Sequence, residues 1–236
     1  MTGTNRTRRI ALINPNASAA VTAMMLGIAR RAVPADAQGR LTLEGFSASE
    51  GPPLITDEAA LADAAAAMPA RVTAIAAEGF DGFIIAGFGD PGLLAVRQQL
   101  AQPVTGIAEA GMAEAASGGR RFAIVTTTTA LHDSLIRTAH DYGHADALAA
   151  VRITPGDVHA VMNDPARMAE ALLACCEQAV RLDGAEAIVL GGGPLASVAE
   201  GIGARIGVPL VEPVAAAVRL AWQRCREGAG RVARAD

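Results

Sequence analysis

Polar side chains and glycines gather in four short turns, and each turn follows a buried-strand pattern. Two of the turns are polar, Asn14-Pro15-Asn16 and Thr126-Thr127-Thr128-Thr129. The other two, residues 87–93 and 191–195, are rich in glycine and proline. Because loops at the carboxyl ends of parallel strands build the sites of α/β proteins, we expect these turns to border a shared cleft.

The amides and hydroxyls of the polar turns suit the binding of a small carboxylate or carbonyl group. Asn14 and Asn16 can donate from their side-chain amides, although asparagine is also a good helix N-cap. Thr126 and Thr127 can form an anion-binding cup with backbone N–H groups at a helix start, although threonine also favours strands and caps. We expect one asparagine to contact a substrate, and Thr127 to do so in preference to Thr126.

Three carboxylates near predicted strand ends are candidate catalytic groups. Glu50, on the loop after residues 41–46, is a general base for water if burial raises its pKa, or else a solvated loop acid. Asp90 can orient water or bond a ring N–H, although Asp-Pro-Gly is also ordinary turn chemistry. Glu212 follows the last predicted strand and is a comparable candidate.

Neither a metal site nor a nucleotide site is indicated. His140 and His144 have helical i, i+4 spacing but no evident third ligand. The Gly191-Gly192-Gly193 run matches neither the Walker pattern nor GxGxxG. Cys175, Cys176 and Cys225 show no ligand spacing, so we expect free structural thiols in a reducing cytoplasm.

Composition limits the partners of the chain. The net charge is −4 and no basic cluster covers a face, which argues against nucleic acid and anionic membranes. No apolar run reaches the roughly 18 residues that a membrane span requires, and the N-terminus lacks an apolar signal-peptide core. A small molecule is therefore the expected partner.

Strand-like and helix-like segments alternate and predict an α/β fold with parallel sheets. Landmarks recur after about 105 to 112 residues, which predicts two pseudo-symmetric lobes. We expect lobe 1 at 1–116, lobe 2 at 117–212, and a C-terminal helix, 213–236, packed back on lobe 1. The expected strands are 9–13, 41–46, 82–86, 104–107, 122–126, 149–153, 187–190 and 209–211. The expected helices are 17–32, 58–78, 131–141, 165–182 and 214–226.

Several motifs together resemble the hydantoin racemase branch of the Asp/Glu racemase superfamily. They are Ile13-Asn14-Pro15-Asn16-Ala17-Ser18, Gly89-Asp90-Pro91-Gly92-Leu93 and Val104-Thr105-Gly106-Ile107-Ala108-Glu109-Ala110. Residues 122–127 and 186–191 continue the match in the same order, so the resemblance spans about residues 9–221. It implies a cofactor-independent, homo-oligomeric enzyme with two Rossmann-like lobes and an active site between them. Glu50 then lies on a loop that borders the pocket in the family.

The resemblance also implies one catalytic cysteine from each lobe, and these positions hold Gly87 and Gly192 here. Glycine has no side chain to move a proton, so racemisation by two thiols is not expected. The leading hypothesis is ring-opening hydrolysis or lyase-type chemistry on a small cyclic ureide, imide or related carboxylate. Water would attack a carbonyl, and backbone N–H groups of Gly87-Phe88 or Gly192-Gly193 would hold the oxyanion. The alternatives are racemisation by bases other than cysteine, and a small-molecule-binding protein without turnover.

Overall fold

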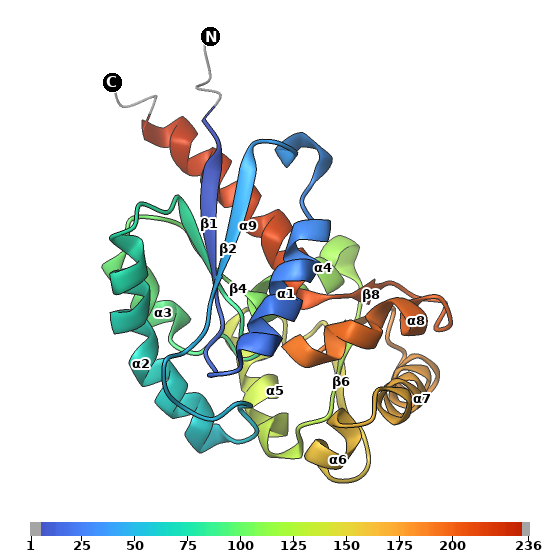
Figure 1. The fold of residues 1–236 in the computed structure, drawn as a ribbon. Helices are drawn as coiled ribbons and strands as arrows, with labels where there is room; N and C mark the ends of the chain where they lie inside the picture. Colours follow the sequence, from blue (N-terminus) through green and yellow to red (C-terminus); the bar gives the residue numbers. More distant parts are fainter. Residues whose placement is uncertain (1–5, 233–236) are drawn as a thin grey trace.

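Two four-stranded parallel sheets form the framework, one in each half of the molecule (Figure 1). The computed structural model describes residues 6–232, except for the side chains of residues 159, 162, 194, 200 and 228–232. The sheet orders are β2-β1-β3-β4 and β6-β5-β7-β8. In each lobe the first strand thus lies between the second and third, and this shared order confirms the pseudo-symmetry expected from the sequence.

The strands end at matching levels, which brings their following loops together. In the first sheet Ile13 of β1 is opposite both Phe46 of β2 and Ile85 of β3. In the second sheet Val125 of β5 is opposite Leu190 of β7. The strands are β1 (Arg8–Ile13), β2 (Leu41–Phe46), β3 (Gly82–Ile85), β4 (Val104–Gly106), β5 (Phe122–Thr126), β6 (Leu148–Ile153), β7 (Ala187–Leu190) and β8 (Leu210–Val211).

Capping side chains fix the starts of the longer helices. Ser18 accepts a hydrogen bond from Val21 N, Asp57 accepts from Ala60 N, and Asp164 accepts from Ala166 N. The α-helices are α1 (Ala19–Arg31), α2 (Glu58–Ala76), α3 (Leu93–Gln99), α4 (Ile107–Ala115), α5 (His132–Asp141), α6 (Val158–Met162), α7 (Pro165–Asp183), α8 (Ala199–Gly203) and α9 (Pro213–Val232). Short 3₁₀ turns lie at Ala35–Ala37, Ser117–Gly119, Thr129–Leu131 and Gly193–Val198.

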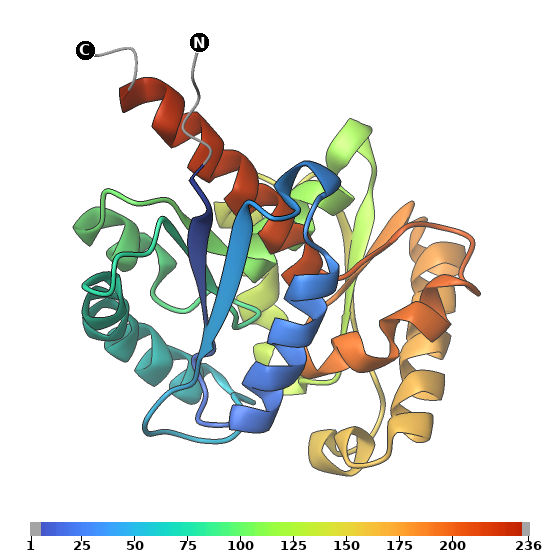
Figure 2. The same ribbon diagram turned by 45° about the horizontal axis from the view of Figure 1, so that its top comes forward.

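Three apolar clusters hold the layers together. Helices α2 and α3 cover the outer face of the first sheet, and α7 and α8 cover the outer face of the second. The largest cluster lies between the sheets and joins Ile84 of β3 and Val189 of β7 to residues of α1, α4 and α9. The lobes therefore share one continuous core, with α9 crossing behind β1 and β2 (Figures 1 and 2).

Helix α9 contacts α1, α4, β3 and β4. Trp222 Nε1 on α9 donates to Asp36 Oδ2 over 3.1 Å, and Arg224 makes two bonds to the Glu109 carboxylate. The helix is thus tied to elements of residues 1–116, while residues 233–236 lie outside the described residues. The lobe boundary between residues 116 and 117 stays a prediction.

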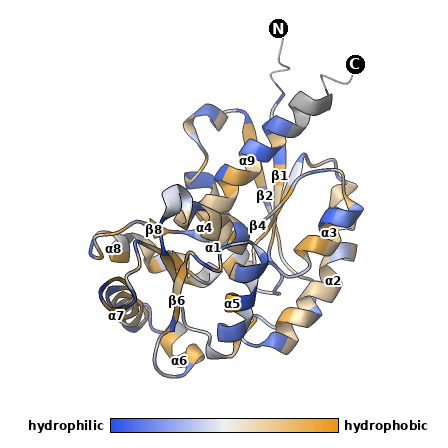
Figure 3. Ribbon diagram, turned by 180° about the vertical axis from the view of Figure 1, so that it is seen from behind, coloured by the Kyte–Doolittle hydropathy of each residue, from blue (hydrophilic) through white to orange (hydrophobic). Residues whose placement is uncertain are grey.

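Helix α2 differs from the expectation that no segment is long and apolar enough to span a membrane. Among the described residues it meets that threshold by length and composition (Figure 3). It also buries Met68, Val72 and Ile75 against the first sheet, as the helix of a folded domain does. One such helix is weak evidence for a membrane span.

The expected strands agree with the structure to within one residue at each end. The expected helices do not include α3, α4, α6 and α8, which have nine residues or fewer. Ile107, expected to end a strand, begins α4 directly after β4. The cause is a long-range contact, because the Asp90 carboxylate accepts the N–H groups of Ala108 and Glu109 at the start of that helix.

Candidate active site

One pocket between the lobes is bordered by the loops that follow β1, β3, β5 and β7. These strands flank the point in each sheet where the strand order reverses, which is where open α/β sheets bind ligands. The cavity has a volume of about 60 Å³. Its lining residues are Pro15, Asn16, Val21, Met25, Leu54, Ile55, Leu61, Ala86, Gly87, Phe88, Thr127, Thr128, Leu131, Gly191, Gly192, Gly193 and Leu195.

The two asparagines after β1 have different surroundings. Asn14 is fully buried, and its Nδ2 donates to Asn16 Oδ1 over 2.8 Å and to Thr22 Oγ1 over 2.9 Å. Asn16 lines the pocket, and its Oδ1 accepts from Asn14 and from the Ser18 N–H. This fixes the Asn16 amide orientation and leaves its Nδ2 without a partner among the described residues. Asn14 therefore supports the loop, and Asn16 can contact a ligand.

The loop after β3 brings Gly87 and Phe88 to the pocket wall. No hydrogen-bond acceptor for the backbone N–H of either residue occurs among residues 6–232. The Phe88 ring reaches the opposite lobe, since a Cβ atom on Gly191 would lie 3.0 Å from its Cε1. Phe88 thus forms a wall between the two halves of the cleft.

The threonines after β5 also divide into a supporting residue and a lining residue. Thr126 is buried outside the pocket, and its Oγ1 donates to Gly191 O over 2.7 Å, which joins the loops after β5 and β7. Thr127 and Thr128 line the pocket. In the part of the chain that the structure describes, their hydroxyls and N–H groups have no hydrogen-bond partner. The expected preference for Thr127 over Thr126 agrees with these positions.

The glycines after β7 lie on the second-lobe side. Gly192 has an extended backbone with φ 167°, and a Cβ there would lie 3.2 Å from Leu195 Cγ. A Cβ on Gly193 would lie 2.6 Å from Met25 Sδ of α1. The first lobe therefore packs closely against this loop.

The three candidate carboxylates do not line the pocket. Glu50 is exposed on the loop after β2. Glu212 accepts the N–H groups of Val214 and Ala215 at the start of α9, and it lines a separate depression bordered by α1 and α8. Burial raises its pKa. The structure gives no support to either residue as the general base, and these roles stay predictions.

Asp90 is buried beside the pocket loop and faces away from the cavity wall. Its carboxylate accepts from Ala108 N over 2.9 Å, Glu109 N over 2.7 Å and the Tyr142 hydroxyl over 2.8 Å. Burial raises its pKa to about 7, against the opposing effect of these hydrogen bonds. Its observed contacts are those of a helix cap, and a catalytic role for it stays a prediction as well.

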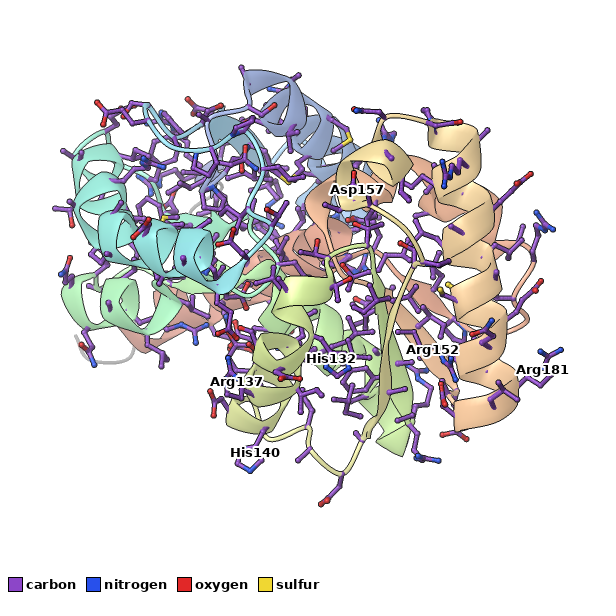
Figure 4. All side chains as sticks on the ribbon, turned by 90° about the horizontal axis from the view of Figure 1, so that it is seen from below. His132, Arg137, His140, Arg152, Asp157 and Arg181 are labelled. Carbon is purple, nitrogen blue, oxygen red and sulfur yellow. The ribbon has the colours of Figure 1, made fainter. Side chains whose placement is uncertain are left out.

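The three cysteines are buried, unpaired and outside the pocket. Burial raises the pKa of Cys175, that of Cys176 to about 12 and that of Cys225 to about 11. They are therefore protonated at neutral pH and take no part in the site. Neither His132 nor His140 of α5 is among the residues that line the pocket, and both are labelled in Figure 4.

The apolar half of the pocket was not predicted from the sequence. Met25 of α1, Leu54 and Ile55 of the loop after β2, and Leu131 after β5 form much of its wall. An available signal was the Leu54-Ile55 pair, two large apolar residues within a loop that contains Gly51, Pro52 and Pro53. The pocket thus combines an apolar wall with amide and hydroxyl donors, which suits a small, partly apolar ring that carries carbonyl groups.

The chemistry of the pocket is restricted by its lining. Among the lining residues that the structure describes, none carries a carboxyl, imidazole, amine or thiol group. What remains is hydrogen-bond donation from both lobes. Such donors bind a carboxylate, or stabilise negative charge that develops on a carbonyl oxygen.

Comparisons with known proteins agree with this arrangement. The family model described as Asp/Glu/Hydantoin racemase matches residues 10–221. A hydantoin racemase of Rhizobium meliloti is 34% identical over 212 residues, covering 90% of this chain and 86% of the relative. A hydantoin racemase of Paenarthrobacter aurescens is 33% identical over 214 residues, covering 90% and 89%.

A solved structure agrees as well. The allantoin racemase from Klebsiella pneumoniae superposes with a TM-score of 0.86 at 33% identity, covering 94% of this chain and 89% of that one. The relatives named here are racemases, so they give no support to the ring-opening hydrolysis expected from the sequence.

Proposed function

Because the chain belongs to the Asp/Glu/hydantoin racemase family, we propose that it is an isomerase of a small cyclic ureide, imide or related carboxylate that works without thiols. The observation that carries the proposal is the pocket lining. Both lobes contribute N–H groups that have no partner among residues 6–232, and the two positions where the family resemblance implies cysteines hold glycine. Binding energy and charge stabilisation then come from backbone donors.

The proposed step is enolisation at the carbon beside a carbonyl. The C–H proton passes to a water molecule, and the C–H electron pair moves so that negative charge develops on the carbonyl oxygen. N–H groups of Gly87-Phe88 or Thr127-Thr128 stabilise that charge. The hydronium ion formed in this step returns a proton, directly or through another water molecule, to either face of the planar carbon, which gives both stereoisomers. The cavity, with a volume of about 60 Å³, has room for the water molecule.

This mechanism predicts a slow enzyme. A positioned side-chain acid or base contributes typically about 10²–10⁴-fold, and water supplies less of that advantage. A donor that stabilises the developing oxyanion is worth about 10²–10³-fold in comparable sites. We therefore expect turnover that is well above the reaction in water but about 10²–10⁴-fold below that of a two-thiol racemase.

Ring-opening hydrolysis is the second candidate, because the donors of the pocket suit it as well as isomerisation. The same donors that stabilise an enolate oxygen also suit the tetrahedral oxyanion formed when water attacks a carbonyl, and neither reaction finds a side-chain base in the lining. The racemase relatives favour isomerisation, so hydrolysis ranks below it.

The test is NMR in D₂O with single enantiomers of hydantoins, cyclic imides and N-acyl amino acids. Isomerisation predicts loss of the C–H signal beside the carbonyl as deuterium enters, with the ring intact. A ring-opened product without deuterium exchange would show that the protein is a hydrolase and not an isomerase. Ligand shifts with neither reaction would indicate a binding protein. The Asn16→Asp variant serves as the control with weakened ligand binding. It replaces the amide donor but keeps the acceptor oxygen that Asn14 and Ser18 use, so the loop stays in place.

A further inference from the structure

The buried carboxylate of Asp90, on the loop after β3, connects that loop to helix α4 and to Tyr142 at the end of α5. Asp90 is 5% exposed, and its two oxygens accept the N–H groups of Ala108 and Glu109 in the first turn of α4 and the hydroxyl of Tyr142. Asp90 N in turn donates to Gly87 O over 2.9 Å. The residue that borders the pocket and the residue that caps α4 are thus parts of one tight turn.

The backbone and the neighbours of Asp90 leave its side chain little freedom to move. Its backbone has φ 48°, an unusual left-handed conformation for a residue other than glycine. A Cβ on Gly106 would lie 2.1 Å from the Asp90 Cγ, so the carboxylate occupies the space that Gly106 leaves free. The surrounding chain therefore holds the carboxylate in one place, although its backbone conformation carries a cost.

Tyr142 brings the second lobe to this carboxylate. It directly follows α5, and its N–H donates back to Thr138 O. Its half-buried ring packs against both the shared core and the cluster of β1, β3, α2 and α3. Helix α5, which Tyr142 follows, begins directly after Leu131, and Leu131 lines the pocket. The Tyr142–Asp90 bond therefore connects the loop after β3 in one lobe to the end of α5 in the other.

We propose that Tyr142 is a positioning residue, and that its hydrogen bond to Asp90 is a proton-sensitive latch that holds the loop of residues 86–92 in register with the second lobe. Aligned loops place the Gly87 and Phe88 N–H groups opposite those of Thr127 and Thr128. The consequence for ligand binding rests on the proposed function, whereas the latch itself does not.

The charged groups around the latch make it sensitive near neutral pH. Burial raises the pKa of Asp90 to about 7, and Glu109 of α4 adds to that effect. The Glu109 carboxylate is itself paired with Arg97 of α3 and Arg224 of α9. Above the pKa the Tyr142 hydroxyl donates to a charged acceptor, which makes a strong bond. Below it the Asp90 carboxylic acid donates instead, and Tyr142 becomes the acceptor in a weaker neutral bond.

The chain offers a selective probe, because Tyr142 is its single tyrosine. Protein labelled with ¹³C at tyrosine Cζ gives one signal, which is followed from pH 5 to pH 9. We expect a titration with a midpoint near 7 in the wild-type protein, and none in Asp90→Asn. A His144→Gln variant keeps the titration, since His144 packs against Phe122 and burial lowers its pKa. A flat wild-type signal, or a titration that survives in Asp90→Asn, overturns the latch.

Hydrogen exchange tests the positioning role without any substrate. Tyr142→Phe removes only the hydroxyl, and we expect exchange of the hydrogen-bonded Asp90 amide and of the first turn of α4 to speed up about tenfold at pH 8. Thr138→Val is the matched control, because the Thr138 hydroxyl bonds Ser134 O within α5. Equal exchange in wild type and Tyr142→Phe contradicts the proposal. Failure of the isomerase assay leaves both latch measurements unaffected.

Discussion

A Cβ atom on Gly87 would lie 2.5 Å from Cγ of Pro15, the residue between the two asparagines of the neighbouring loop. Any side chain at position 87 therefore requires Pro15 to move. At Gly192 the nearest atom to such a Cβ is Leu195 Cγ at 3.2 Å, and the backbone there is extended. The two glycines that stand where the family resemblance implies cysteines thus differ in how easily they accept a side chain.

The first prediction concerns restoring thiols. Gly87→Cys is expected to lower the free energy of unfolding by about 1–3 kcal/mol, because added atoms in a close-packed region displace their neighbours. Gly192→Cys is expected to cost less than about 1 kcal/mol, because only a flexible leucine must adjust. Urea unfolding measures both. Gly201→Cys is the control, since its Cβ meets nothing within 4 Å. Equal costs at positions 87 and 192 would contradict the difference.

The second prediction separates the two asparagines. Asn16→Asp keeps the oxygen that accepts from Asn14 and Ser18 but replaces the free amide donor, so ligand affinity should fall at least about tenfold with a small stability change. Asn14→Asp removes donors to buried acceptors and should destabilise by about 1–3 kcal/mol. Calorimetric titration and urea unfolding give the two quantities. The reverse pattern would show that Asn14 is the ligand contact.

The third prediction uses neighbouring threonines. Thr126→Val leaves the buried Gly191 carbonyl without its 2.7 Å partner, and we expect a loss of about 1–3 kcal/mol in stability. Thr127→Val removes a hydroxyl that has no partner among the described residues, so the loss should appear in ligand affinity instead. Each variant is the control for the other. If Thr127→Val binds as the wild type does, its hydroxyl is not a ligand contact.

The fourth prediction is a pH dependence of stability. The pKa of Asp90 rises on folding from an ordinary value near 3.8 to about 7. Between these values the folded state binds a proton that the unfolded state releases, so this contribution is present at low pH and is lost as pH rises through about 7. Its slope is up to about 1.4 kcal/mol per pH unit.

Asp90→Asn should remove this slope, although the variant is less stable overall. The measurement is the difference in unfolding free energy between wild type and Asp90→Asn at pH 5, 6, 7 and 8. A difference that stays constant across this range would show that Asp90 is ionised throughout.

The sequence predicted the fold well because its signals are local. Short apolar runs bounded by turns located all eight strands, and Ser18, Asp57 and Asp164 mark the starts of long helices. Helix α4 was not predicted because its start depends on a distant residue. Its cap comes from Asp90, 17 residues before its first residue, Ile107.

The site was predicted in part. Four strand-end loops meet at the pocket as expected, and Asn16, Gly87, Phe88, Thr127, Gly192 and Gly193 line it. Sequence alone could not separate Asn16 from Asn14, because both side chains suit the same turn and only the structure shows that Asn16 lines the pocket. It also could not reveal that Asp90 and Glu212 accept backbone N–H groups at the starts of helices.

The most direct test of the proposed chemistry is amide NMR of ¹⁵N-labelled protein titrated with hydantoin. If backbone donors from both lobes bind the carbonyl groups, the N–H signals of Gly87 or Phe88 and of Thr127 or Thr128 should move downfield together, in one saturable transition. The N–H signals of Val21 and Leu61, which line the apolar wall from helices, should shift less. Binding that leaves the loop amides of either lobe unchanged would contradict a mechanism built on donors from both sides.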